Sequence, residues 1–391
     1  SGTMSSDSEN INVFCRVKPS PEDDTVEYKA RNDYSENIAE LEIANPLQSM
    51  NRHSQNAQTT HKFAFTKIFD QTSTQSDIYE AAGRPLVESS FQGINGTLFV
   101  YGQTATGKTY TVSGYDNDGA TSPIGESPRE LSVTEDSGVI TRVLSDIFSG
   151  STGDNELESV TISYLEIYKE VGYDLLGEGR SKSHPDELPR VTPMKDARKR
   201  LNLRNLSVHT VNSEQEALRW FELGNTNRKV AETHLNDASS RSHCVFTIGV
   251  TCKKGGNNKT TLTAKVNIVD LAGSERVGKS HIERSTLLSE ARNINLSLHH
   301  LQQVIVALSK GALRHIPYRN SLLTQVLSDS LGGNSRTVMV ATISAQTRHL
   351  EESVSTCQFA QRVAEITNKV KANETMDPDA LILRLQDEIK I

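Results

Sequence analysis

Eight residues run Gly102-Gln103-Thr104-Ala105-Thr106-Gly107-Lys108-Thr109 and match the phosphate-binding loop pattern G-x-x-x-x-G-K-S/T at every fixed position. The apolar, β-prone residues 97–101 just before them predict a buried strand that leads into this loop. Both glycines allow a tight turn in which backbone N–H groups and the start of the next helix face an anion. Lys108 is predicted to reach the β- and γ-phosphates, and the Thr109 hydroxyl to bind Mg²⁺. A nucleoside-triphosphate site is therefore predicted, and a chance glycine-rich turn is the alternative.

The composition of the chain limits its class. With 391 residues it is long enough for two average domains or one large α/β domain. It has no run of about 18 apolar residues, so we expect no membrane span. The residues near the N-terminus include no apolar segment of the kind found in signal peptides, so we expect no secretion. The formal net charge of −7 argues against a general nucleic-acid-binding protein. The four cysteines are scattered, and we expect reduced cytosolic thiols without a disulfide framework or a zinc site.

Strand-like and helix-like segments alternate along the chain, which predicts an α/β class with a layered sheet covered on both faces. Predicted strands cover residues 11–17, 62–65, 97–101, 160–167, 244–251, 262–269 and 337–343. Helices are predicted over 139–148, 213–219 and 288–308. Polar stretches rich in Gly, Pro, Ser or Asn predict loops at 48–60, 115–136 and 177–193.

A second nucleotide-binding element follows the predicted strand at 262–269. Residues 270–273 are Asp-Leu-Ala-Gly, of the form D-x-x-G, and we call them the D-x-x-G loop. In phosphate-loop enzymes such an Asp binds Mg²⁺, commonly through water, and the Gly N–H can bond a γ-phosphate oxygen. The guanine-reading sequence N-K-x-D is absent, since residues 368–371 match it without the Asp, and this disfavours a GTPase.

A third element, residues 236–243, places two adjacent hydroxyls and an arginine before the predicted strand at 244–251. By itself this segment is also consistent with an ordinary serine-rich turn. In combination, however, G-Q-T-x-x-G-K-T at 102–109, N-x-x-S-S-R-S-H at 236–243 and D-L-A-G-S-E-R at 270–276 resemble the kinesin motor domain. Further matching segments lie at 163–176, 224–228, 331–337 and 359–362, so the resemblance extends from about residue 11 to about residue 368. Residues 359–364 and 373–378 are most similar to the ciliary kinesins, class nine.

The resemblance implies a single kinesin-type P-loop NTPase motor domain over residues 4–366. Its central sheet is expected to be mostly parallel or mixed, with eight strands and three helices on each face. Ser1-Gly2-Thr3 before Met4 is expected to be a cloning remnant. Residues 367–377 correspond to a neck linker, and 378–391 to the start of a neck helix or stalk. This helix is too short to hold a dimer by itself, so we expect a monomeric fragment of a chain that forms a homodimer through a coiled coil.

The resemblance also implies an ATPase that binds ATP or ADP with Mg²⁺. Thr109 and Ser240 are expected to ligate the Mg²⁺, and Asp270 to hold it through water. Ser239 and the Gly273 amide are expected to surround the γ-phosphate and the attacking water. Positioning and charge stabilisation then supply the rate, since phosphoryl transfer needs little covalent help from the protein.

Two further contacts are implied around the nucleotide. Arg241 and Glu275 are expected to form an ion pair that closes two switch loops over ATP. The adenine is expected to lie between Arg16 or Pro19 on one side and Tyr110 on the other. The family's R-x-R-P is R-V-K-P here, and because Arg stacks better than Lys, base contact is expected to weaken slightly if that position takes part.

The implied partner is the microtubule, whose acidic tubulin surface favours a basic binding face. The expected contacts are Lys195, Arg198, Lys199, Arg200, Lys279, Arg284, Arg319 and Arg336. Without the family context, the cluster at 195–204 is equally consistent with a solvated charge run. Three usually basic positions carry Leu296, Leu322 and Gln325 here, and if each faces tubulin the loss is a few tenths to about 1 kcal/mol apiece.

Two functions therefore compete within the family. The first is a microtubule-stimulated ATPase that moves toward the plus end, in the cytoplasm on the cytoskeleton and, if the subclass holds, in a cilium or flagellum. The second is an ATP-hydrolysing, microtubule-binding kinesin with little motility that acts as a brake, anchor or scaffold. A third class, a soluble kinase or GTPase, would require the kinesin-like segments to be a coincidence.

Overall fold

One mixed sheet of twelve strands organises the computed structural model, which describes residues 7–20, 25–33, 38–44, 60–114, 132–150, 155–177, 188–195, 201–234, 241–254, 260–275, 285–311 and 315–376. The strand order is β11 (Leu201–Arg204), β10 (Arg190–Lys195), β9 (Val171–Asp174), β8 (Glu156–Tyr168), β13 (His243–Lys253), β14 (Thr260–Asp270), β7 (Gly96–Gly102), β15 (Arg336–Ser344), β2 (Asn12–Lys18), β6 (Lys67–Phe69). β12 (His209–Val211) also pairs with β8, and β17 (Glu374–Met376) with β14. The sheet is mixed, as expected, but it has twelve strands where eight were expected, because short strands extend it beyond β8 and β14.

The centre of this sheet is parallel. β7 lies between β14 and β15 and runs parallel to both, with Val100 opposite Asp270 on one side and Val340 on the other. The carboxyl ends of these strands therefore meet at one edge of the sheet. The phosphate loop and the D-x-x-G loop both leave the sheet at this edge.

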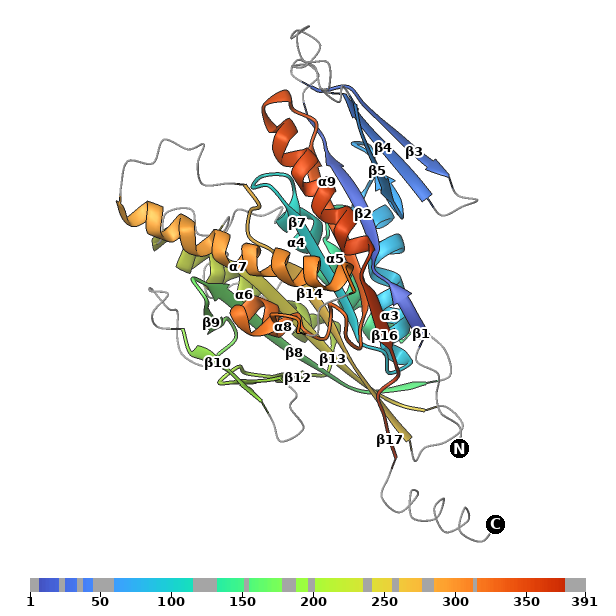
Figure 1. Cartoon of the computed structure of the whole chain (residues 1–391). Coiled ribbons are helices and arrows are strands. Elements are labelled where there is room, and N and C mark those ends of the chain that lie inside the picture. Colours follow the sequence, from blue (N-terminus) through green and yellow to red (C-terminus); the bar gives the residue numbers. More distant parts are fainter. Residues whose placement is uncertain are drawn as a thin grey trace, which may run out of the picture.

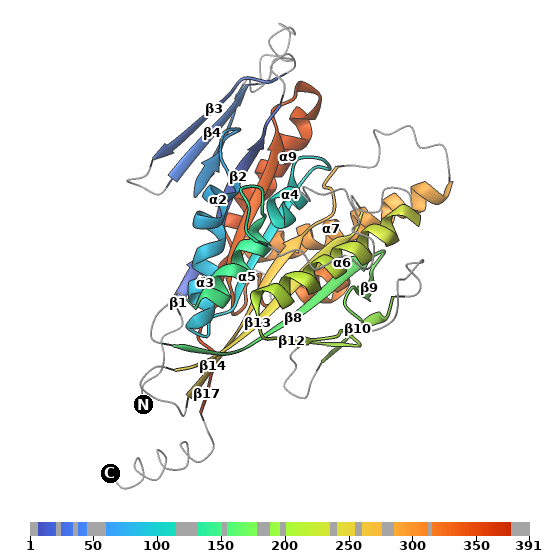
Figure 2. The same cartoon turned by 180° about the vertical axis from the view of Figure 1, so that it is seen from behind.

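Helices cover both faces of the sheet (Figures 1 and 2). One face carries α7 (Ser285–Ser309), α8 (Leu322–Val326) and α9 (Leu350–Ala364), with the 3₁₀ turns η6 (Tyr318–Asn320) and η7 (Thr347–His349). The other carries α3 (Arg84–Phe91), α5 (Val139–Ser149) and α6 (Glu214–His234), with the shorter α2 (Gln75–Ile78), η2 (Tyr79–Gly83) and α4 (Lys108–Ser113). β7 divides the core between them, since Leu98 and Val100 pack with α3, α5 and α6, whereas Phe99 packs with α7, α8 and α9. Within the described ranges, three longer helices thus cover the second face as expected, with short pieces added.

The strands and helices predicted from the sequence pattern are confirmed. The strand at 62–65, however, belongs to a separate antiparallel sheet of β3 (Tyr28–Asp33), β4 (Ile38–Ala44) and β5 (Thr60–Phe65), which the pattern did not predict. This sheet rests on α9, where the Gln361 amide bonds both the N–H and the carbonyl of Ala64. The predicted loops lie mostly outside the described residues, and the one at 177–193 is wrong at its end because β10 begins at Arg190. Of the helices described, none has the length and apolar character needed to span a membrane.

The two ends of the described chain lie side by side. β1 (Asp7–Asn10) pairs antiparallel with β16 (Thr367–Val370), with Glu9 opposite Asn368 (Figure 1). Asn368 is buried, and its amide donates to the carbonyls of Ser330 at 2.9 Å and Ser335 at 2.7 Å. The first half of the predicted neck linker is therefore attached to the start of β15 and to the N-terminal strand.

Helix α6 packs on β8 at a glycine. A β-carbon at Gly224 would collide with the ring of Tyr164 and come within 3.2 Å of Leu176. The Tyr164 ring cannot easily move, because it is in edge contact with Phe246 at a centroid distance of 5.2 Å. Close backbone approach at this point therefore requires glycine.

We expect Gly224→Ala to lower the free energy of unfolding by about 1–3 kcal/mol, because overpacking outweighs the gain of about 1 kcal/mol in helix propensity. Urea unfolding of the 391-residue chain measures this change. Thr226→Ala, at an exposed position of the same helix, is the control and should be nearly neutral. Equal stability of Gly224→Ala and the unmodified chain would contradict the packing argument.

Candidate active site

The predicted phosphate loop is a turn between β7 and α4 that depends on two glycines. At Gly102 a β-carbon would collide with the carbonyl of Thr342 on β15, so this approach of two backbones requires glycine. Gly107 precedes α4 with φ 97°, in the left-handed region. Ala105 also has a positive φ of 64°, which is uncommon for a residue with a side chain. The loop thus has a defined backbone conformation that few other sequences would adopt.

Lys108 begins α4 and points back into the loop. Its Nζ donates to the carbonyls of Gly102 at 3.0 Å and Gln103 at 2.8 Å, and only 7% of the residue is exposed. Burial lowers the pKa of this ammonium group, while the nearby carboxylates of Asp270 and Glu275 act in the opposite direction. A buried cation at the centre of the loop is suited to bind phosphate oxygens, as predicted.

Asp270 ends β14 and faces the phosphate loop. The Thr109 hydroxyl donates to its Oδ2 at 2.7 Å. Its other oxygen, Oδ1, is buried and has no hydrogen-bond partner among the described residues. A buried carboxylate oxygen without a donor calls for a further partner, and hydroxyl and carboxylate oxygens are the ligands that Mg²⁺ prefers. Thr109 and Asp270 therefore fit the predicted Mg²⁺ site.

Arg228 is a residue of this site to which the sequence analysis gave no role. It lies on α6, and its Nη1 forms an ion pair with Asp270 Oδ2 at 3.2 Å, with both side chains buried. Breaking such a buried pair by removing one partner costs about 3–5 kcal/mol. The one signal in the sequence was its place in the family-like segment 224–228, but no local pattern identifies a partner 42 residues away.

Glu275 connects the D-x-x-G loop to the phosphate loop. The backbone N–H of Thr104 donates to its Oε2 at 2.8 Å, and the Thr104 hydroxyl donates to its Oε1. A β-carbon at Gly273 would collide with the Thr104 hydroxyl and with the Glu275 carboxylate. The next backbone N–H, of Ser274, donates to the carbonyl of Gly102 at 3.1 Å. The structure thus brings the two predicted nucleotide-binding loops into direct contact.

The third predicted element is described only at its end. Ser239 and Ser240 lie outside the described residues. Arg241 is half-buried just before β13, and its ion pair with Glu275 stays a prediction.

Arg16, one of the residues predicted to contact adenine, has partners within the fold. This residue is buried on β2, and its guanidinium carbon lies 4.8 Å from the centroid of the Tyr110 ring. Its Nη1 also donates to Gln75 at 2.9 Å and to Thr111 at 2.7 Å. Arg16 and Tyr110 thus stack on each other in this structure, and the contact of Arg16 with adenine stays a prediction.

The neighbouring residues of this segment are exposed. Pro19 is exposed, and its contact with adenine opposite Tyr110 stays a prediction. The Lys18 ammonium donates to the carbonyl of Ala105 at 2.8 Å. The second basic position of R-V-K-P therefore contacts the phosphate loop itself.

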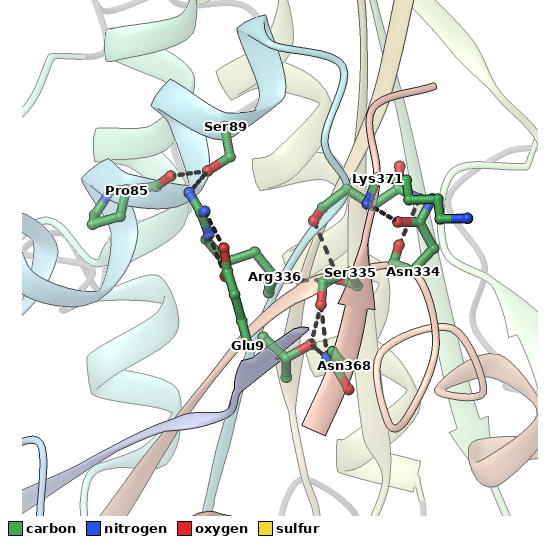
Figure 3. Close-up of polar contacts among 10 residues, drawn as sticks. Glu9, Pro85, Ser89, Asn334, Ser335, Arg336, Asn368 and Lys371 are labelled. Carbon is green, nitrogen blue, oxygen red and sulfur yellow. Dashed lines mark hydrogen bonds and ion pairs between the residues drawn. The ribbon is translucent and has the colours of Figure 1, made fainter. Parts of the chain in front are cut away.

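Arg336 is wrong as a microtubule contact. Its Nε and Nη2 donate to the Glu9 carboxylate at 2.9 and 2.6 Å, and its Nη1 donates to the Ser89 hydroxyl at 2.6 Å (Figure 3). The reason is that β1 crosses beside the first residue of β15, so the guanidinium binds partners within the fold.

The other predicted partner residues divide into three groups. Arg319 is exposed on η6, and Lys195 is the last residue of β10, whereas Arg198, Lys199, Arg200, Lys279 and Arg284 lie outside the described residues. Of the positions that lack a basic residue, Leu296 is 40% exposed on α7 and Gln325 is half-buried on α8. Leu322 is only 5% exposed and packs in the core beneath α8, so this position does not face a partner.

Comparisons with known proteins agree on one family. The model of the kinesin motor domain matches residues 16–366. The chain is 36% identical over 97% of its length to the kinesin-like protein KIN-5C of Arabidopsis thaliana and 38% identical over 84% to KIF3C of Bos taurus. It spans 37% and 41% of the length of these two relatives.

Solved structures give the same result. A structure described as a fast kinesin has a TM-score of 0.75 at 33% identity, with 94% of this chain and 95% of that chain covered. A KIF14 dimer with AMP-PNP in complex with a microtubule has a TM-score of 0.79 at 31% identity, with 97% and 100% covered. The match over most of the chain, together with the two predicted nucleotide-binding loops that meet at one sheet edge, shows that the chain belongs to the kinesin motor-domain family, whose members are ATPases that bind ATP or ADP with Mg²⁺.

Proposed function

We propose that this chain hydrolyses ATP at the contact between its two nucleotide loops and uses the reaction to change its attachment to microtubules. The observation that carries the proposal is the hydrogen bonding of Glu275 to Thr104, because it attaches the residues after the D-x-x-G loop to the phosphate loop, so that a movement of one displaces the other. Lys108 would stabilise negative charge on the β- and γ-phosphates, while Gly273 and Ser239 would position the γ-phosphate and the attacking water. Mg²⁺, held by Thr109, Ser240 and Asp270, would neutralise phosphate charge.

The microtubule is the proposed partner. The KIF14 structure similar to this chain is in complex with a microtubule, which supports the assignment. The proposed contacts are Lys195, Arg198, Lys199, Arg200, Lys279, Arg284 and Arg319. We propose that the full-length protein is a homodimer and that this chain alone is a monomer.

We further propose that residues 367–377 are a neck linker whose attachment to the motor drives movement toward the plus end. The pairing of β16 with β1 and of β17 with β14 supports this role, since it attaches the segment to the motor at two places. An order–disorder change of such a segment is a known way to convert a nucleotide state into movement.

The alternative is an ATP-dependent brake or anchor with little motility. The exposure of Leu296 on α7 favours it, because an apolar side chain stands where the family usually has a basic one. The subclass of ciliary kinesins, with a place in cilia or flagella, is likewise a proposal that rests on the segments at 359–364 and 373–378.

We expect Glu275→Ala to leave ATP binding nearly intact and to lower microtubule-stimulated turnover by about tenfold or more, because the contact that closes the two loops is lost. Steady-state ATPase with and without microtubules, together with nucleotide affinity, measures both effects. Glu275→Gln, which keeps an acceptor for the Thr104 N–H, should lose less. Unchanged turnover in Glu275→Ala would show that closure does not depend on this residue.

Reversal of Arg198, Lys199 and Arg200 to Glu should weaken microtubule affinity and reduce its dependence on salt, while basal ATPase barely changes. Co-sedimentation with microtubules at two ionic strengths measures this. Reversal of Lys29 and Arg31, on β3 of the separate sheet, is the control for a simple loss of positive charge. If both variants bind alike, the cluster is an ordinary solvated charge run.

The direction of movement is tested by gliding of the full-length protein on polarity-marked microtubules. We expect slow plus-end-directed gliding that stops when residues 367–374 are replaced by a Gly-Ser segment of equal length, since Asn368 and the β16 pairing are then lost, while ATPase continues. Lys371→Ala, an exposed position of the same segment, is the control. Minus-end gliding would refute the neck assignment, and microtubule-stimulated ATPase without gliding would favour the brake or anchor.

A further inference from the structure

His243 makes hydrogen bonds at both ends of its ring to two different elements. It is the first residue of β13 and is only 2% exposed. Its Nδ1 accepts from the backbone N–H of Ala272 at 3.0 Å, and its Nε2 lies 2.7 Å from the hydroxyl of Ser297. The imidazole is therefore a direct bridge between the D-x-x-G loop and α7.

The chemistry of these contacts fixes the state of the ring. A backbone N–H can only donate, so Nδ1 carries the lone pair and Nε2 carries the proton that is donated to Ser297. Burial, with the charge of Lys108 as a smaller cause, lowers the pKa of His243 to about 3, so the ring stays neutral at physiological pH. Because the ring is planar and hydrogen-bonded at both ends, a displacement of Ala272 moves Ser297 as well.

The two bonded partners occupy informative positions. Ala272 directly precedes Gly273, whose N–H is the proposed donor to the γ-phosphate. Ser297 is 4% exposed on the inner side of α7, and its neighbour Leu296 is 40% exposed on the outer side. The His243 side chain alone thus separates the D-x-x-G loop from α7, and the other face of this helix is exposed at Leu296.

We propose that His243 is a positioning residue whose two hydrogen bonds transmit a displacement of the D-x-x-G loop to α7. The proposal rests on the proposed function in one respect, that Gly273 senses the γ-phosphate. If His243 had a purely structural role, it would only supply hydrogen-bond partners to the Ala272 N–H and the Ser297 hydroxyl. Its loss would then not change how α7 responds to the D-x-x-G loop.

Hydrogen–deuterium exchange of the α7 amides tests the coupling without microtubules. The unmodified chain should show different exchange at residues 298–308 with ADP and with a non-hydrolysable ATP analogue. In Ser297→Ala this difference should shrink by at least about fivefold, the lower end of typical coupling between two sites. Ser90→Ala is the matched control and should keep the difference, because Ser90 is a buried serine of α3 whose hydroxyl donates to the carbonyl of Val87 in the same helix.

His243 itself is tested by two substitutions. His243→Gln offers an amide oxygen to the Ala272 N–H and an amide N–H to Ser297, so it should retain at least half of the exchange difference of the unmodified chain. His243→Leu offers neither and should abolish the difference. If His243→Leu does not fold, Ser297→Ala and His243→Gln still decide. The proposal is overturned if Ser297→Ala keeps the full difference, or if α7 of the unmodified chain exchanges alike in both nucleotide states.

Microtubule co-sedimentation in the same two nucleotide states separates this proposal from the proposed function. The ratio of the two affinities should fall at least about fivefold in Ser297→Ala and stay unchanged in Ser90→Ala. If the unmodified chain binds microtubules in neither state, the proposed function fails, while the exchange experiment still decides whether His243 couples the loop to α7.

Discussion

The parallel pairing of β7 with β14 is the constraint on which the nucleotide site depends. It places Val100 opposite Asp270, so the loops that follow the two strands leave the sheet side by side. The 2.7 Å bond from Thr109 to Asp270 and the contact of Thr104 with Glu275 both require this register. A slip of one residue would turn the Asp270 side chain to the opposite face of the sheet, away from Thr109.

Charge balance then holds the interior of the site together. Lys108 and Arg228 supply two buried cations, and Asp270 and Glu275 supply the carboxylates that face them. Buried charges are tolerated only when they are paired, so each member of this group depends on the others. A nucleotide would add several negative charges to this group, so its binding or hydrolysis would change the electrostatic interactions of residues in both loops.

One strand connects this site to the neck segment. Near its end β15 meets the phosphate loop, where the hydroxyls of Thr342 and Thr106 lie 2.7 Å apart. At its start, Arg336 binds Glu9, and the carbonyl of Ser335 accepts from Asn368 (Figure 3). Because β15 is buried along most of its length, it forms a rigid link between the place where ATP would react and the segment proposed to move.

The sequence by itself determined the features that depend on short stretches of chain. The phosphate loop, the D-x-x-G loop and the long strands follow from local turn chemistry and hydrophobic period, and all were predictable. Only the tertiary structure decided which side chains face each other. Arg336 and Glu9 are 327 residues apart, and Arg16 and Thr111 are 95 apart, so no local pattern could show that these cations bind partners inside the fold. The burial of Leu322 and the short edge strands were decided in the same way, because both depend on neighbours that arrive only when distant segments pack together.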